Sequence, residues 1–223
     1  MSDGSSQTTS SNPLAIVLSC RKNEHLWRGI LEKNINNLII FCGDPELKTN
    51  YLFKNKIIYL KCEDTYDHLP TKMYMIIQAI LDIDEFSSIT HIFKFDDHDT
   101  MVETNIIYKI KSVVTKNLDY GGQKVQGKNK KKNSFRGDNT WHYNKCPKSS
   151  IWDNKPYLGA YTPWCDGGCG YLLSRKSMKL IKNSLSKEEI YKNHIYEDLM
   201  IGLVLYNHDI HPIETGKIIV GDK

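Results

Sequence analysis

Residues 90–100 read THIFKFDDHDT, an apolar run that ends in the polar residues Asp96, Asp97, His98 and Asp99. The apolar run predicts a buried strand. Three carboxylates and an imidazole at the end of a strand are costly to pack together. Like charges this close repel and raise one another's pKa unless a cation lies between them. The stretch therefore predicts a strand that leads directly into a metal site.

Three earlier segments repeat the same design of an apolar run followed by polar or turn residues: LAIVLSC (14–20), NLIIFCGD (37–44) and KIIYLKC (56–62). Near-continuous apolar runs are typical of strands covered on both faces, as in a parallel sheet. Apolar residues at helical spacing in 69–84 and 102–114 predict helices after the third and fourth strands. This order favours an α/β sandwich whose ligands bind beyond the carboxyl ends of the strands.

The composition indicates a soluble globular protein. The 223 residues suffice for one sizeable domain, and a net charge of +4 is too small to indicate nucleic acid by itself. No apolar stretch approaches the roughly 20 residues of a membrane span. Residues 1–12 are polar, lack the regions of a signal peptide and are expected to be a disordered leader. We expect a cytoplasmic protein, although a lumenal domain separated from its anchor would have the same composition.

The six cysteines are scattered along the chain. Cys165 and Cys169 have a spacing that would suit zinc, but no second pair accompanies them. We therefore expect reduced thiols, as is usual inside cells, or at most a local disulfide between Cys165 and Cys169.

Residues 120–140 are rich in glycine and lysine and show no periodicity, which predicts a mobile loop. A second function class rests on this loop: Lys128, Lys130, Lys131 and Lys132 would make the protein a polyanion- or nucleic-acid-binding module. Aromatic side chains that stack on bases are sparse in the loop, so no nucleic acid is expected as a partner.

The last third of the chain combines aromatic residues with a glycine-rich turn. CDGGCGYLLS (165–174) predicts a turn whose backbone closely approaches a neighbour or adopts positive φ, followed by a short strand. YEDLMIGLVLYN (196–207) predicts a buried helix, because its later residues are apolar on all sides. Glu197 and Asp198 stand at the start of this helix, where the helix dipole alone also favours acids.

The acidic cluster has two interpretations. Asp97 or Asp99 would serve as the N-cap of a following helix. However, three acids and a histidine exceed what capping needs, so we favour a metal site. Carboxylate and imidazole together suit Mn²⁺, with Mg²⁺ as the second choice. The same acids would also serve a metal-dependent phosphohydrolase, which is a third function class.

Four motifs in order carry a resemblance to one family: CEDTYDHLPTK (62–72), FKFDDHD (93–99), TPWCDGGCGYLLS (162–174) and YEDLMIG (196–202). The sequence resembles the β-1,3-glycosyltransferases of the galactosyltransferase and fringe type. Their pattern has an Asp-x-Tyr-x-x-Leu-x-x-Lys helix start, a strand ending in Asp-Asp-Asp, a Gly-x-Gly-Tyr segment and a Glu-Asp-Val motif. Each motif alone is weak, and their shared order and spacing make the resemblance specific.

The resemblance implies a GT-A fold, a Rossmann-like α/β/α sandwich with a mostly parallel sheet, as a single domain over 13–223. It divides this domain into a nucleotide-binding half (about 13–118), the basic loop and an acceptor-binding half (about 141–223). It implies metal-dependent transfer, with inversion, of a hexose or N-acetylhexosamine from a UDP-sugar. The acceptor would be a hydroxyl of a glycan or glycoconjugate, and the new bond a β-1,3 linkage.

The resemblance also implies roles for single residues. Asp198 falls on the family's catalytic base, and Asp96, Asp97 and Lys72 fall on the donor side. The acceptor side would comprise Trp164, Gly168, Gly170, Tyr171 and Glu197. The chemistry agrees with these roles, because a cation stabilises a leaving diphosphate and a carboxylate must deprotonate the acceptor hydroxyl.

His98 stands where the family has its third aspartate. We therefore predict that the metal ligands are His98, Asp96 and Asp99, with the Asp96-x-His98 pair preferred. The rival interpretation uses Asp97-x-Asp99, with His98 pointing away. The family often adds a histidine ligand well after the Glu-Asp motif, and the only candidates for it here are His208 and His211.

Overall fold

The structure, a computed structural model, describes residues 11–97, 102–114, 118–125, 139–216 and 218. Its centre is an eight-stranded sheet with the strand order β10-β6-β9-β5-β1-β2-β4-β3. Four neighbouring pairs are parallel and three are antiparallel. The strands are β1 (Pro13–Leu18), β2 (Leu38–Gly43), β3 (Tyr51–Lys54), β4 (Ile57–Leu60), β5 (His91–Asp96), β6 (Tyr120–Gly122), β9 (Tyr171–Ser174) and β10 (Ile213–Glu214).

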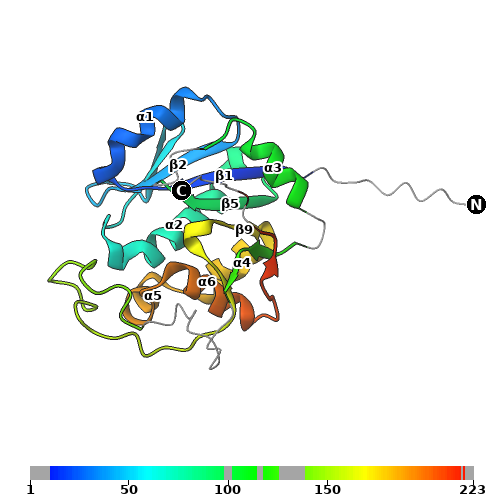
Figure 1. Ribbon diagram of the computed structural model, residues 1–223. Coiled ribbons are helices and arrows are strands. Elements are labelled where there is room, and N and C mark those ends of the chain that lie inside the picture. Colours follow the sequence, from blue (N-terminus) through cyan, green and yellow to red (C-terminus); the bar gives the residue numbers. More distant parts are fainter. Residues whose placement is uncertain (1–10, 98–101, 115–117, 126–138, 217, 219–223) are drawn as a thin grey trace, which may run out of the picture.

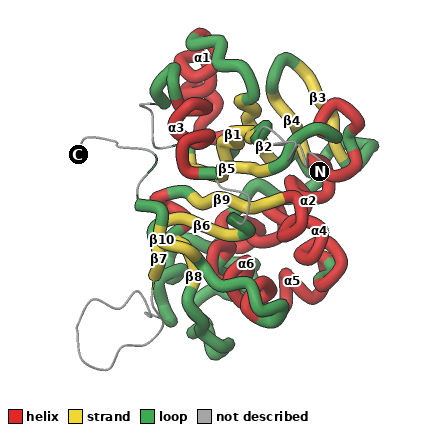
Figure 2. Tube along the Cα trace, turned by 90° about the vertical axis from the view of Figure 1, so that its right-hand side faces the viewer, coloured by secondary structure: helices red, strands yellow, loops and turns green. Residues whose placement is uncertain are grey.

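Helices cover both faces of the sheet, as Figures 1 and 2 show. One layer holds α1 (Glu24–Glu32) and α3 (Ile106–Val113). The other holds α2 (Leu69–Asp82), α4 (Arg175–Ser184), α5 (Lys187–Asn193) and α6 (Glu197–Tyr206). The short 3₁₀ turns are η1 (Arg21–Asn23), η2 (Tyr66–His68), η3 (Asp84–Phe86) and η4 (Gly167–Cys169). The predicted single-domain α/β/α sandwich is confirmed.

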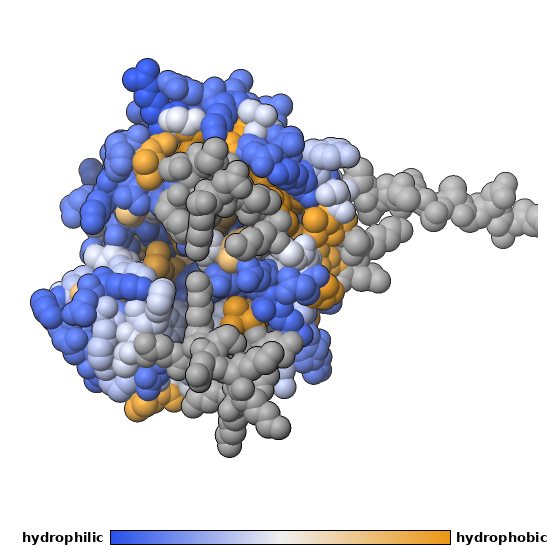
Figure 3. Space-filling model, viewed as in Figure 1, coloured by the Kyte–Doolittle hydropathy of each residue, from blue (hydrophilic) through white to orange (hydrophobic). Residues whose placement is uncertain are grey.

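Strand β1 shows why the sequence has continuous apolar runs. Its alternate residues Leu14 and Ile16 join the core on the α2 side, whereas Ala15 and Val17 join the core on the α1 and α3 side. Because both faces of the strand are covered, no position along it tolerates an exposed polar side chain. Figure 3 shows that hydrophilic residues cover much of the visible outer surface.

The parallel strands bring the polar motifs to one edge of the sheet. Strand β5 lies beside β1, with Leu18 opposite Asp96 at the point where both strands end. Strand β2 flanks β1 on its other side and ends at Gly43. Asp96 therefore lies where ligands of α/β sheets bind, as the sequence predicted.

The structure differs from the prediction of a loop over 120–140. Residues 120–122 form strand β6 of the main sheet, and β7 (Lys124–Val125) pairs with β8 (Trp164–Cys165). Gly121 and Gly122 serve close packing, since a Cβ on Gly122 would lie 3.0 Å from both Cys165 Cβ and the Gly170 carbonyl oxygen. Glycine here permits the close approach of neighbouring backbones, which a sequence pattern cannot distinguish from a loop signal.

Two predictions fall mainly outside the described residues. These are the disordered leader, of which residues 1–10 are not described, and the Lys-rich part of the loop, which lies within 126–138. Asn12 belongs to the folded part, because its backbone N–H donates to Thr90 Oγ1 over 3.0 Å and its carbonyl accepts from the Thr90 N–H. Within the described ranges, no helix combines the length and apolar character that a membrane crossing needs.

Candidate active site

Two cavities adjoin at the carboxyl ends of the central strands. The acid cavity, about 330 Å³, is lined by Lys94, Trp141, Tyr161, Trp164, Gly167, Gly168, Tyr196, Glu197 and Asp198 among others. The strand-end cavity, about 640 Å³, is lined by residues including Ser19, Cys20, Lys22, Asn23, Asp64, Lys72, Asp97 and Lys145. Leu18, Tyr66, Leu69 and Asp96 line both cavities, so the two form one continuous site.

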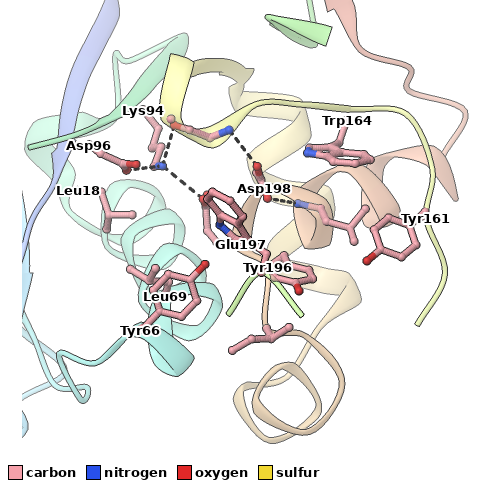
Figure 4. Close-up of a pocket in the computed structure, with 15 residues that line it drawn as sticks. Leu18, Tyr66, Leu69, Lys94, Asp96, Tyr161, Trp164, Tyr196, Glu197 and Asp198 are labelled. Carbon is pink, nitrogen blue, oxygen red and sulfur yellow. Dashed lines mark hydrogen bonds and ion pairs between the residues drawn. The ribbon is translucent and has the colours of Figure 1, made fainter. Parts of the chain in front are cut away.

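Lys94 forms part of the wall of the acid cavity and reaches both Asp96 and Glu197 (Figure 4). Its side chain is only 2 % exposed, and its Nζ lies 2.6 Å from Asp96 Oδ1 and 3.3 Å from Glu197 Oε2. The ammonium also donates to the Gly167 carbonyl oxygen over 3.2 Å. Burial alone would lower the pKa of Lys94, but the carboxylates of Asp96 and Glu197 outweigh burial and raise it. Lys94 is therefore a fixed positive charge that links β5 to the start of α6.

Glu197 is buried behind this lysine. Its carboxylate accepts a hydrogen bond from the Tyr171 hydroxyl. Burial raises the pKa of Glu197 to about 7, against the opposing attraction of the Lys94 ammonium. A buried carboxyl group that titrates near neutrality is common at functional sites.

Asp198 lies partly buried beside the glycine-rich turn. Its Oδ2 accepts from the Gly167 N–H over 3.0 Å, and its Oδ1 accepts from the Leu199 N–H over 2.8 Å. Burial raises the pKa of Asp198, although these two hydrogen bonds and Lys94 oppose the shift. The first turn of α6 thus places the Asp198 carboxylate at the acid cavity, where two backbone hydrogen bonds fix its orientation (Figure 4).

The predicted acceptor-side residues divide into two groups. Trp164, Gly168 and Glu197 line the acid cavity. Gly170 and Tyr171 are not among the lining residues and instead shape the wall from behind. Gly170 has φ +77, and a Cβ there would lie 2.6 Å from the Phe93 ring, so only glycine fits.

The side chain of Asp166 holds the glycine-rich turn in shape. Asp166 Oδ1 accepts from the N–H groups of Gly168 and Cys169 over 2.9 and 3.2 Å. None of the chain's six cysteines, all of which are described, forms a disulfide, which agrees with the expected thiols.

Asp97 is held in the strand-end cavity by polar neighbours. Its carboxylate accepts from Ser19 Oγ over 2.5 Å and from Asn23 Nδ2 over 3.0 and 3.1 Å. Trp27 Nε1 in turn donates to Ser19 Oγ. Both carboxylate oxygens of Asp97 therefore already accept hydrogen bonds from other side chains of the protein. Asp96, in contrast, faces both cavities.

Lys72 lies on the same edge of the sheet but in a closed arrangement. Its ammonium contacts the carboxylate of Asp64 and donates to the Ser19 carbonyl oxygen over 3.0 Å. Asp64 also accepts from the backbone N–H groups of Arg21 and Gly43 over 2.6 and 3.0 Å. The pair therefore joins α2 to the ends of β1 and β2 and forms part of the cavity floor.

The predicted metal ligands are only partly described. His98 and Asp99 lie outside the described residues, so the choice between the two ligand registers stays a prediction. Asp96 has the right position for a ligand, because it faces both cavities and, within the described chain, its side chain forms an ion pair only with Lys94, at Oδ1. Its second oxygen would suit Mn²⁺ or Mg²⁺. Elsewhere in the described ranges, no three His, Cys, Asp or Glu side chains gather as a metal site.

His208 and His211 lie beyond the far end of α6. The ten residues of this helix separate them from Glu197 by about 15 Å. His208 Nε2 lies 2.9 Å from Ser184 Oγ, and His211 packs edge-on against Tyr206. Neither histidine lines either cavity, which argues against both as metal ligands.

Sequence reasoning did not assign several residues that line the site. Lys94 carried a signal, because it is a lone charge inside an apolar run, two residues before Asp96 and thus on the same face of the strand. Trp141, Lys145 and Tyr196 carried no comparable signal. Whether these three side chains reach the site depends on the tertiary packing of the segments that carry them, which no local sequence pattern reports.

A single-domain α/β/α sandwich around a mostly parallel central sheet is consistent with the GT-A fold. The profile of the galactosyltransferase family matches residues 51–215, which is well over half of the chain. The protein therefore belongs to the galactosyltransferase family and is a glycosyltransferase. A search of curated proteins finds no match.

Proposed function

We propose that the protein is a metal-dependent, inverting glycosyltransferase that uses a UDP-sugar. It moves a hexose or N-acetylhexosamine to a hydroxyl of a glycan or glycoconjugate and forms a β-1,3 linkage. One observation carries the proposal: Asp96 and the Glu197–Asp198 pair meet around Lys94 where two cavities join. The strand-end cavity would take the nucleotide, and the acid cavity would hold the reacting sugar and the acceptor.

Asp198 would act as the general base. Its carboxylate would take the proton of the acceptor hydroxyl while that oxygen attacks the anomeric carbon from the face opposite the diphosphate. The bond between the anomeric carbon and the diphosphate oxygen breaks, and UDP leaves with the electron pair. The raised pKa of Asp198 suits this role, because a more basic carboxylate is a better proton acceptor.

The leaving diphosphate needs positive charge beside it. Asp96, together with the predicted ligands His98 and Asp99, would hold a divalent cation that stabilises the charge on the leaving group. Lys94 would hold Asp96 in place and supply a second, fixed positive charge to the cavity. The N–H of Gly167 and the ammonium of Lys94 both favour the ionised form of Asp198.

Binding and turnover of sugar nucleotides test this proposal. Thermal shift with UDP-galactose, UDP-N-acetylglucosamine, UDP-glucose and UDP-xylose, each with and without Mn²⁺, should show Mn²⁺-dependent stabilisation by at least one donor. That donor should also release UDP slowly when no acceptor is present. If no donor in the panel binds or turns over with Mn²⁺, the proposal fails. Release of inorganic phosphate from a nucleotide would point instead to a phosphohydrolase.

A further inference from the structure

Tyr66 lies at the boundary between the two cavities. It is the first residue of η2, directly before α2, and it is one of the four residues that line both cavities. Figure 4 shows its ring on the wall of the acid cavity, with the hydroxyl pointing inward. The side chain is half-buried, so its hydroxyl can contact a ligand that passes from one cavity into the other.

The hydroxyl of Tyr66 differs from those of other tyrosines in the core. Tyr74 donates to the Leu185 carbonyl oxygen over 2.9 Å, and Tyr171 donates to Glu197. In contrast, no hydrogen bond joins the Tyr66 hydroxyl to another described residue. Because buried hydroxyls normally have a partner, a hydroxyl that points into a cavity without one is a candidate for contact with a ligand.

The surroundings of Tyr66 keep its hydroxyl protonated. Burial raises the pKa of Tyr66, and the negative charges of Asp198, Asp96 and Glu197 raise it further. A neutral phenol offers an O–H to a ligand and adds no negative charge where carboxylates already gather. Such a group suits an anionic ligand better than a further carboxylate would.

The turn that carries Tyr66 is held in place by its own side chains. Thr65 Oγ1 donates to Asp67 Oδ1 over 2.6 Å, and the His68 N–H donates to the Thr65 carbonyl oxygen over 3.1 Å. The Tyr66 side chain also packs against the apolar cluster that contains Trp164. A hydroxyl on such a support needs little ordering to meet a ligand.

We infer that the Tyr66 hydroxyl donates a hydrogen bond to the β-phosphate of the sugar nucleotide. The inference rests on the proposed function, in which the nucleotide fills the strand-end cavity and Asp198 acts in the acid cavity. The diphosphate must then lie where the two cavities join, and its β-phosphate carries the oxygen that leaves the anomeric carbon. As that bond breaks, the electron pair stays on the phosphate oxygen, and the O–H of Tyr66 stabilises the added charge.

The competing explanation is that Tyr66 serves only as a ring in the cavity wall. Tyr66→Phe removes the oxygen and keeps the ring, so the packing against the Trp164 cluster is retained. Titration calorimetry with UDP and with UMP, in the presence of Mn²⁺, separates the two explanations, because only UDP carries a β-phosphate. Tyr108→Phe is the matched control, since Tyr108 lies on α3, is 74 % exposed and lines neither cavity.

Tyr66→Phe should weaken UDP binding about tenfold, the order expected for one hydrogen bond to a charged group, and leave UMP binding unchanged. Unchanged UMP binding would also show that the variant is folded, and Tyr108→Phe should bind both nucleotides as the wild type does. Equal losses for UDP and UMP, or no loss of UDP binding, would overturn the inference alone. If the folded wild type binds no UDP, the proposed function itself fails.

Discussion

Two buried lysines, Lys72 and Lys94, lie on the same edge of the sheet and have different surroundings. Their side chains are 1 % and 2 % exposed, and each ammonium contacts carboxylate and backbone carbonyl oxygens. Among the residues that the structure describes, Lys72 has one carboxylate partner, Asp64, whose own oxygens are engaged by backbone N–H groups. Its network is closed, with one positive charge matched to one negative charge.

Lys94 instead serves two carboxylates from different elements, Asp96 and Glu197, with Asp198 adjoining them. The negative groups outnumber the cation, and this imbalance contributes to the raised pKa of Glu197. A buried pair with one positive and one negative charge stabilises the fold. A buried cluster with more carboxylates than cations leaves one carboxylate with a raised pKa beside a cavity. The comparison predicts that substitutions around Lys94 mainly lower the rate of sugar transfer, whereas substitutions around Lys72 mainly lower the free energy of unfolding.

The largest expected effect is on Asp198. Asp198→Asn should lower the rate of sugar transfer by about 10⁴-fold, the upper range for loss of a general base, because an amide cannot accept the proton. UDP affinity should stay nearly the same, as measured by titration calorimetry. Asp64→Asn, the same substitution beside the other lysine, should instead lower the free energy of unfolding. Loss of UDP binding in Asp198→Asn would show that Asp198 serves the nucleotide.

Removal of each lysine tests the comparison directly. Lys72→Met should lower the free energy of unfolding by about 3–5 kcal/mol, the cost of leaving the buried partner unpaired. Lys94→Met should lower it by less at pH 6, because Glu197, with a pKa of about 7, is already largely protonated there and leaves no second buried charge unpaired. Urea unfolding measures both. Equal losses of stability would break the distinction between the two networks.

The pH dependence of stability should identify Glu197. Its pKa of about 7 in the folded protein exceeds the ordinary value of 4.5, so the folded state holds a proton that the unfolded state releases. The free energy of unfolding should therefore fall by a few kcal/mol (about 2–3) through this group as pH rises from 5 to 8. Glu197→Gln should lack this part of the pH dependence. An unchanged slope in Glu197→Gln would assign the titration to another group.

The smallest expected effect is that of Tyr171→Phe. Loss of the hydroxyl that donates to Glu197 should cost about 1–2 kcal/mol in stability. It should also shift the midpoint of the Glu197 titration to higher pH, since this hydrogen bond lowers the pKa of Glu197. Comparison of unfolding curves across pH checks both effects. A midpoint that moves to lower pH would contradict the assigned direction of the bond.

Local patterns predicted the elements with strong periodicity. The strands around 14–20, 37–44, 56–62 and 90–96 and the helices that begin at Leu69 and Glu197 agree with the structure, because apolar spacing reports directly which faces are buried. The same patterns gave no sign of β3, whose residues are mostly exposed at the edge of the sheet. They also gave loop signals for β6, whose glycines serve close packing.

The sequence by itself determined the fold class, the family and the placing of acids at a strand end and at a helix start. Those properties depend on neighbours within a few residues, so they can be recognised along the chain. Only the tertiary structure decided that Asp64 belongs to Lys72 and that Asp96 and Glu197 share Lys94. It also decided that Lys145, which lines the strand-end cavity, stacks on Trp141, which lines the acid cavity. Such pairings join segments up to about a hundred residues apart, and their electrostatics follow from shared burial, which no local pattern encodes.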